Sequence, residues 1–99
     1  MLNSRQRAFL RGRANTLETI FQIGKQDITE NMTADISRAL EKRELIKLHV
    51  LENSGLTARE AARQIADATR SEVVQVIGGR FILYRESKTL PADLRIKLP

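Results

Sequence analysis

The stretch EVVQVIGGRFILYR, residues 72–85, decides the fold because it places two strand patterns on either side of a Gly-Gly pair. Val73–Ile77 and Arg80–Arg85 are rich in β-branched, aromatic and other apolar residues, which is typical of strands. Gly78-Gly79 predicts a two-residue hairpin turn between them. A β-sheet is therefore expected at the centre of the fold.

Two shorter segments upstream are also predicted to be strands. Ile20–Ile23 is short, apolar and β-branched, which is typical of a buried strand. Leu45–Leu51 alternates, so that Ile46, Leu48 and Val50 share one face while Lys47 and His49 lie on the other. The tail after Pro91 alternates in a similar way at Leu94, Ile96 and Leu98, which predicts a short edge strand.

Three helices are predicted between and before these strands. The first begins at Ser4, which is a good cap, and runs to about Leu17. The second opens at Ile28-Thr29 and ends near Lys42-Arg43, and the third runs from the capping box Thr57-x-x-Glu60 to Thr69-Arg70-Ser71. The order α-β-α-β-α-β-β predicts an α/β fold of the two-layer α+β kind, with helices covering a four-stranded mixed sheet.

Length and composition exclude several classes of protein. The chain has 99 residues, which is enough for one domain with one core. It has no cysteine, which excludes disulfides, Cys-zinc sites and thiol catalysis and fits a reducing compartment, so a cytoplasmic location is expected. The longest apolar run, Phe81–Tyr84, is far shorter than the roughly 20 residues that a membrane span needs, and no apolar segment follows the N-terminal arginines as a secretory signal would require.

Charge is the most informative feature of the composition. The net charge is +5, and 12 of the 17 basic residues are arginine. Residues 1–17 carry +4, residues 18–79 carry −2 and residues 80–99 carry +3. Basic ends of this kind favour a polyanionic partner, and arginine binds phosphate with a bidentate fork. Solubility alone is the plainer explanation for a charge of this size.

Residues that could carry catalysis or bind a metal are sparse. His49 is the single histidine and has no second metal-ligand type beside it. No nucleophile, base and orienting group can be drawn together, so we expect neither an enzyme nor a cofactor, metal or small-molecule substrate. Glu41 and Glu44 are expected to meet Arg38 or Arg43 in an ordinary solvated pattern at a helix end.

The turn Gly24–Thr29 is the strongest candidate for binding. It joins a predicted strand to a helix N-terminus, whose free N–H groups and dipole favour phosphate. Glycine at position 24 lets a nucleic-acid backbone approach closely, and Lys25 adds a cation. Asp27 would repel phosphate at close range, and a simple strand-to-helix turn is the alternative interpretation.

The chain resembles the YhbY family, the bacterial stand-alone form of the CRM domain, which is named for chloroplast RNA splicing and ribosome maturation. The resemblance rests on five segments in register, which are QRAFLR (6–11), IFQIGK (20–25), ELIK (44–47), EVVQVIG (72–78) and LYR (83–85). It covers about residues 4–87. Residues 1–87 are therefore expected to form a CRM-like RNA-binding domain, with residues 88–99 as a C-terminal tail.

The resemblance also implies a fold, a partner and a site. The family fold is similar to the C-terminal domain of translation initiation factor three, and its bacterial members bind RNA and are associated with the large ribosomal subunit precursor. The family's GxxG loop falls on Gly24 to Asp27, with Asp27 in place of the second glycine. Asp tolerates a positive φ, so the turn can survive, but its charge opposes phosphate.

We therefore predict a monomer that binds ribosomal RNA through its phosphate backbone during large-subunit assembly. The predicted RNA-binding residues are Gly24, Lys25, Gln26, Asp27 and Thr29 in the turn, Arg5, Arg7 and Arg11 in the first helix, and Lys47, Arg80 and Arg85 on strands. The four aromatic residues are expected mostly in the core, which argues against a base-stacking platform. The alternatives are a protein-interaction module that pairs through the Leu94–Leu98 tail, and non-specific binding of double-stranded DNA without a recognition helix.

Overall fold

The computed structural model describes residues 1–25 and 28–99. The helices are α1 (Ser4–Ala14), α2 (Glu30–Arg43) and α3 (Ala58–Thr69), and the strands are β1 (Thr19–Ile23), β2 (Leu45–Val50), β3 (Glu72–Ile77) and β4 (Arg80–Tyr84). Two short 3₁₀ turns, Glu52–Ser54 and Ala92–Leu94, complete the chain. The predicted order α-β-α-β-α-β-β and the four-stranded mixed sheet are confirmed.

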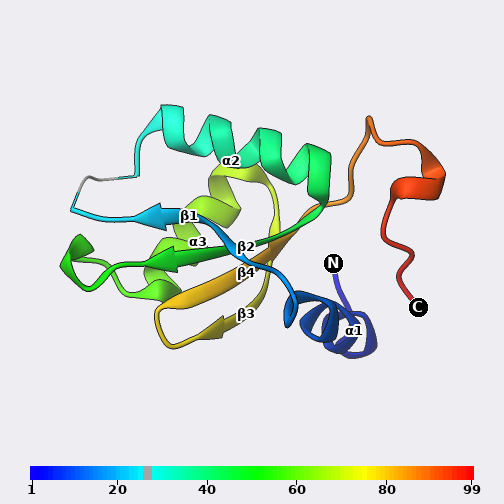
Figure 1. The fold of residues 1–99 in the computed structure, drawn as a ribbon, viewed down its shortest axis with the longest axis horizontal. Coiled ribbons are helices and arrows are strands. Elements are labelled where there is room, and N and C mark those ends of the chain that lie inside the picture. Colours follow the sequence, from blue (N-terminus) through cyan, green and yellow to red (C-terminus); the bar gives the residue numbers. More distant parts are fainter. Residues whose placement is uncertain (26–27) are drawn as a thin grey trace.

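The strands lie in the order β1-β2-β4-β3, so β4 is inserted between strands that precede it in the chain (Figure 1). β1 pairs parallel to β2, whereas β4 is antiparallel to both β2 and β3. The register pairs Gln22 with His49, His49 with Arg80, and Arg80 with Ile77. These four residues form a row that crosses the whole sheet.

The main core lies between the sheet and the pair α2 and α3. Ile36 and Leu40 of α2, together with Ile65 of α3, are fully buried against Phe81 and Leu83 of β4. Three small residues of α3 are buried as well, namely Ala61, Ala62 and Ala66. Alanine brings a helix backbone close to its neighbours, so α3 packs tightly on this face of the sheet.

The opposite face is covered by α1 and by the end of the chain. Leu10 and Ala14 of α1 are buried with Leu45, Ile82 and Tyr84 of the sheet. Two residues of the tail also pack against this second cluster, namely Ile96 and Leu98. Figure 1 shows α1 near one end of the sheet and the end of β1 at the other. No helix in the described ranges is both long and apolar enough to cross a membrane.

The start and end of α1 differ from the prediction. Asn3, not Ser4, is the cap, because its side chain accepts from Gln6 N–H at 2.8 Å while the Gln6 side chain accepts from Asn3 N–H at 3.1 Å. The helix ends at Ala14 rather than Leu17. Arg13 in the last turn is exposed, with its guanidinium 5.8 Å from the Phe9 ring centre.

The tail forms no edge strand, which corrects the prediction from its alternating pattern. It contains the 3₁₀ turn Ala92–Leu94 and otherwise runs irregularly. Ile96 and Leu98 alternate because both pack against the second cluster, and the Ile96 N–H donates to a Glu44 carboxylate oxygen at 2.6 Å instead of to a strand. Leu94 remains exposed. Pairing of the tail as an added strand therefore has no support in the fold.

Arg70 ends α3 in the left-handed region, with φ 56°, where glycine is the usual residue. We expect Arg70→Gly to raise the free energy of unfolding by about 1 kcal/mol, because glycine removes the Cβ penalty of this conformation. Gly78, with φ 56° in the hairpin, is the matched control, and Gly78→Ala is expected to lower the same quantity. Urea denaturation of both variants measures it, and no gain for Arg70→Gly would contradict the strain.

Candidate nucleic-acid interface

The Gly24–Thr29 turn begins where β1 ends. The Leu51 N–H donates to the Ile23 carbonyl at 2.9 Å, which fixes the chain just before Gly24. A Cβ on Gly24 would meet the Leu51 side chain at 3.8 Å, which is ordinary contact. The fold therefore does not itself require glycine at this position. Lys25 is exposed.

The far side of the turn is the N-terminus of α2. Thr29 caps it, with its hydroxyl oxygen accepting from Met32 N–H at 3.1 Å. Glu30 is exposed in the first turn of α2. Its negative charge opposes the binding of an anion at the N-terminus of this helix. The predicted site residues Gln26 and Asp27 lie outside the described residues. Of the predicted turn residues, Lys25 is thus the cation that the structure places at the surface.

The predicted arginines of α1 lie away from this turn. Figure 1 shows α1, which carries them, well separated from the end of β1 along the longest axis of the molecule, whose extent is 39 Å. Arg7 donates to the Val73 carbonyl on the edge strand β3, so its guanidinium helps to attach α1 to the sheet. Arg5 is exposed and Arg11 is half-buried. The structure therefore does not bring the α1 arginines and the turn into one patch.

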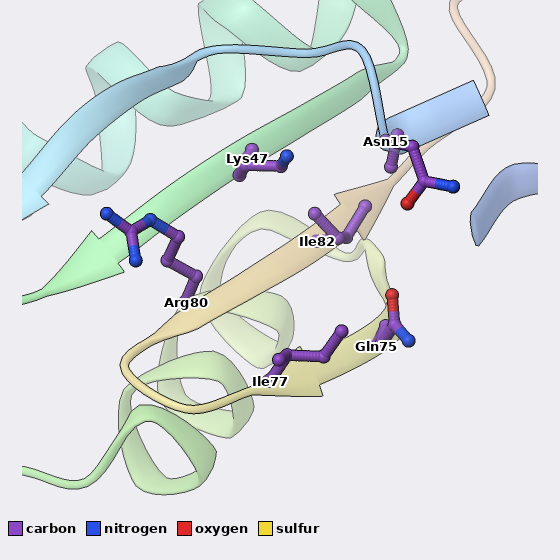
Figure 2. A pocket seen from close by; sticks show the side chains of 7 residues that line it. Asn15, Lys47, Gln75, Ile77, Arg80 and Ile82 are labelled. Carbon is purple, nitrogen blue, oxygen red and sulfur yellow. The ribbon is translucent and has the colours of Figure 1, made fainter. Parts of the chain in front are cut away.

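Lys47 and Arg80, by contrast, lie together on the part of the sheet that α1 leaves open. They line one hollow of about 180 Å³ on adjacent strands β2 and β4. Figure 2 shows the rest of its lining, which consists of Ala14, Asn15, Gln75, Ile77 and Ile82. None of these residues is acidic. We call this surface, from the hollow to the row Gln22, His49, Arg80 and Ile77, the open sheet face.

The sequence anticipated only part of the open sheet face. The alternation of β2 correctly placed Lys47 and His49 on one side. It gave no sign that Gln75 and Ile77 lie beside them, because that proximity depends on β4 pairing with both β2 and β3. Ile77 is 62% exposed, which is unusual for a large apolar side chain on a strand. An exposed isoleucine beside two cations indicates a binding surface, and the sequence patterns did not predict this combination.

Arg85, another predicted RNA contact, is bound within the protein. Its guanidinium donates to the Ser37 hydroxyl at 2.9 Å, to the Ser37 carbonyl at 2.7 Å and to the Thr69 carbonyl at 2.8 Å. It also pairs with Glu41 at 3.3 Å. Arg85 thereby joins α2, α3 and the end of β4. We leave it out of the proposed interface because these partners occupy its donors.

Glu41 and Glu44 do not form the solvated helix-end pattern that the sequence suggested. Glu44 is fully buried, and its carboxylate accepts from Ser87 N–H at 2.7 Å and from Ile96 N–H. Glu41 accepts from the backbone N–H groups of Lys88 and Thr89 at 2.7 and 2.8 Å. Arg38 pairs instead with Asp35. The two glutamates therefore anchor the tail, and no group of three potential metal-binding side chains occurs among the described residues.

Comparison with known proteins identifies related chains. The CRS1/YhbY (CRM) domain model matches residues 2–85. The probable RNA-binding protein YqeI of Bacillus subtilis is 42% identical over 99 residues, which is the full length of both chains. A protein of Haemophilus influenzae named as an RNA-binding protein is 34% identical over 98 residues, covering 99% of this chain and 95% of that one.

A solved structure gives the same result for the fold. The solution structure of a Staphylococcus aureus protein, described as a candidate RNA-binding protein, matches with a TM-score of 0.75. The two chains are 45% identical and each is covered completely. The α/β arrangement described above is therefore that of a known structure.

The bonds to Glu41 make attachment of the tail depend on pH. Hydrogen bonds from Thr89, Lys88 and Ser87 lower the pKa of Glu41 from 4.5 to about 2. Because the pKa is lower in the folded state, the stabilisation is complete above about pH 4.5 and is lost as the pH falls towards 2. We expect Glu41→Gln to reduce stability at neutral pH and to flatten this acid limb. Denaturation experiments between pH 7 and 2.5 measure the free energy of unfolding, with Glu52→Gln at an exposed position as the control. If Glu41→Gln loses as much stability between these pH values as the wild type does, the role of Glu41 is contradicted.

Proposed function

The chain belongs to the CRS1/YhbY (CRM) domain family, and on that premise we propose that it binds structured RNA without catalysing a reaction. The observation that carries the proposal is the match over residues 2–85, together with full-length relatives that are named RNA-binding proteins. We further propose that the RNA is ribosomal and that binding occurs during assembly of the large subunit. This finer assignment rests on the family resemblance found in the sequence.

The charges on the open sheet face support an RNA partner. Lys47 and Arg80 lie on a surface that carries no acidic side chain. Cations without nearby carboxylates attract phosphate, and phosphate contacts supply much of the affinity of nucleic-acid binding. The β3–β4 hairpin and the end of β1, after which Lys25 follows, lie at the same end of the sheet (Figure 1). Lys25 therefore extends the basic surface beyond the strands.

The aromatic residues indicate how the RNA is bound. Phe81 and Tyr84 are buried, while Phe9 and Phe21 pack partly buried against the two clusters. They offer no exposed platform on which successive bases could stack. Binding therefore depends on the RNA backbone and on its shape. Arg5 and Arg11 are proposed to contact a second stretch of backbone at the α1 end.

The contribution of the turn can be measured with two lysines. We expect Lys25→Ala to weaken binding to large-subunit ribosomal RNA, because it removes the exposed cation after Gly24. Lys42→Ala, an exposed lysine at the other end of α2, is the matched control and is expected to have little effect. Asp27→Gly restores the family's second glycine and removes a negative charge, so it should tighten binding. Equal affinities for all three variants would refute a role for the turn.

The contribution of the sheet can be separated from that of general charge. We expect the double variant Lys47→Ala/Arg80→Ala to bind RNA more weakly. The slope of log K against log salt concentration should also become shallower, by the amount that corresponds to the loss of roughly two phosphate contacts. The control is Arg59→Ala/Arg63→Ala, which removes the same charge from exposed positions on α3, on the other side of the sheet. A salt titration with RNA and with matched duplex DNA measures both. Equal losses in the two double variants would contradict the open sheet face, and equal affinity for RNA and DNA would contradict RNA preference.

A further inference from the structure

The hollow on the open sheet face has the composition of a nucleotide site rather than of a plain phosphate contact. We propose that it holds one unpaired nucleotide of the bound RNA, with the base or ribose inside and the adjoining phosphates at the rim. This inference rests on the proposed function and adds the part of the RNA that the site takes. Neither the family match nor the names of the relatives assign a residue to such a site.

The floor of the hollow is apolar and firmly held. Ile82 is 5% exposed and Ala14 is 2% exposed, so both are anchored in the cluster beneath α1. Ile77 stands at the outer side and is largely exposed. Figure 2 shows the side chains of Ile82 and Ile77 on neighbouring strands within one concave surface. A flat, partly apolar base gains by covering such a surface, because that removes apolar area from water.

The rim supplies the polar partners that a nucleotide needs. Gln75 and Asn15 are amides, which can both donate to and accept from the edges of a base. Lys47 and Arg80 are the cations for phosphate, and a guanidinium can also stack on a base. In the part of the chain that the structure describes, these four side chains form no hydrogen bond or ion pair with the protein. Their polar groups are therefore available to a ligand.

Size and charge exclude other occupants. A hollow of about 180 Å³ is smaller than the roughly 300–1,000 Å³ of a typical site for a whole small molecule or cofactor. It matches a fragment of a larger chain that enters from the open side. Two cations with no carboxylate in the lining favour an anionic chain. The antiparallel register places Gln75 opposite Ile82 and Ile77 opposite Arg80, so pairing of β3 with β4 sets the relative positions of these four lining residues.

The test compares a fully paired RNA duplex with the same duplex carrying one bulged nucleotide. We expect the wild-type protein to bind the bulged duplex about tenfold more tightly, which corresponds to burial of roughly 55 Å² of apolar surface. Gln75→Trp fills the hollow without changing charge and places an aromatic residue on a strand, where it is tolerated. It should abolish the preference while keeping the affinity for the paired duplex. Gln64→Trp, on the exposed side of α3, is the matched control and should keep the preference.

Each other outcome overturns the assignment in a distinguishable way. Equal binding of both duplexes by the wild-type protein would refute the proposal that the hollow holds an unpaired nucleotide, but would leave the proposal of RNA binding intact. A preference that survives in Gln75→Trp, with its fold verified by circular dichroism, would place the bulge elsewhere on the protein. Loss of affinity for both duplexes in that variant would show that the hollow contacts only the RNA backbone and not an unpaired nucleotide. Binding of neither duplex by the wild type would overturn the proposed function as well.

Discussion

A four-stranded sheet has two faces to cover, and two of the three α-helices in the described part of the chain lie on the same one. α2 and α3 bury Phe81 and Leu83 completely, so that face is closed. α1 is 11 residues long and covers Leu45 and Tyr84 at one end of the other face. The strand pleat then obliges alternate residues of the remaining half to face outward. The open sheet face therefore results from the uneven coverage of the sheet by helices. Its cations occupy outward-facing positions that stay in contact with solvent.

The boundary of the open face depends on a polar network at the opposite end of the sheet. Arg85 joins α2 to α3, and Glu41 and Glu44 hold the backbone after β4. Burying the Glu44 carboxylate is costly unless both of its oxygens accept hydrogen bonds, and here both do. The network directs the tail back over α1, where Ile96 and Leu98 complete the second cluster. The tail therefore closes one half of the face and leaves the other exposed.

Local patterns predicted nearly all of the fold, because helix and strand periodicity, the Thr57 capping box and the Gly78-Gly79 turn act over a few residues. The errors lie where distant residues decide. Glu44 binds Ile96 across 52 residues, and no local signal reveals a buried carboxylate. For the same reason, the sequence predicted the individual cations of the candidate site but not that they lie together. Lys47 and Arg80 become neighbours through the insertion of β4 beside β2, which the order of elements along the chain does not specify.

The cations of the proposed interface are arranged in a way that suits recognition of RNA shape better than of RNA sequence. Lys25 follows the end of β1, Lys47 and Arg80 lie on the open sheet face, and Arg5 and Arg11 lie on α1, which covers the other end of the sheet. Lys47 and Arg80 are fixed to strands and Arg5 and Arg11 to a helix along a molecule 39 Å in length, so the separations of these four backbone positions are set by the fold. Double-stranded RNA presents its phosphates at separations set by its own geometry, and proteins read it largely through that geometry. A rigid series of cations with one hollow between them fits a folded RNA in which a helix is interrupted by an unpaired nucleotide.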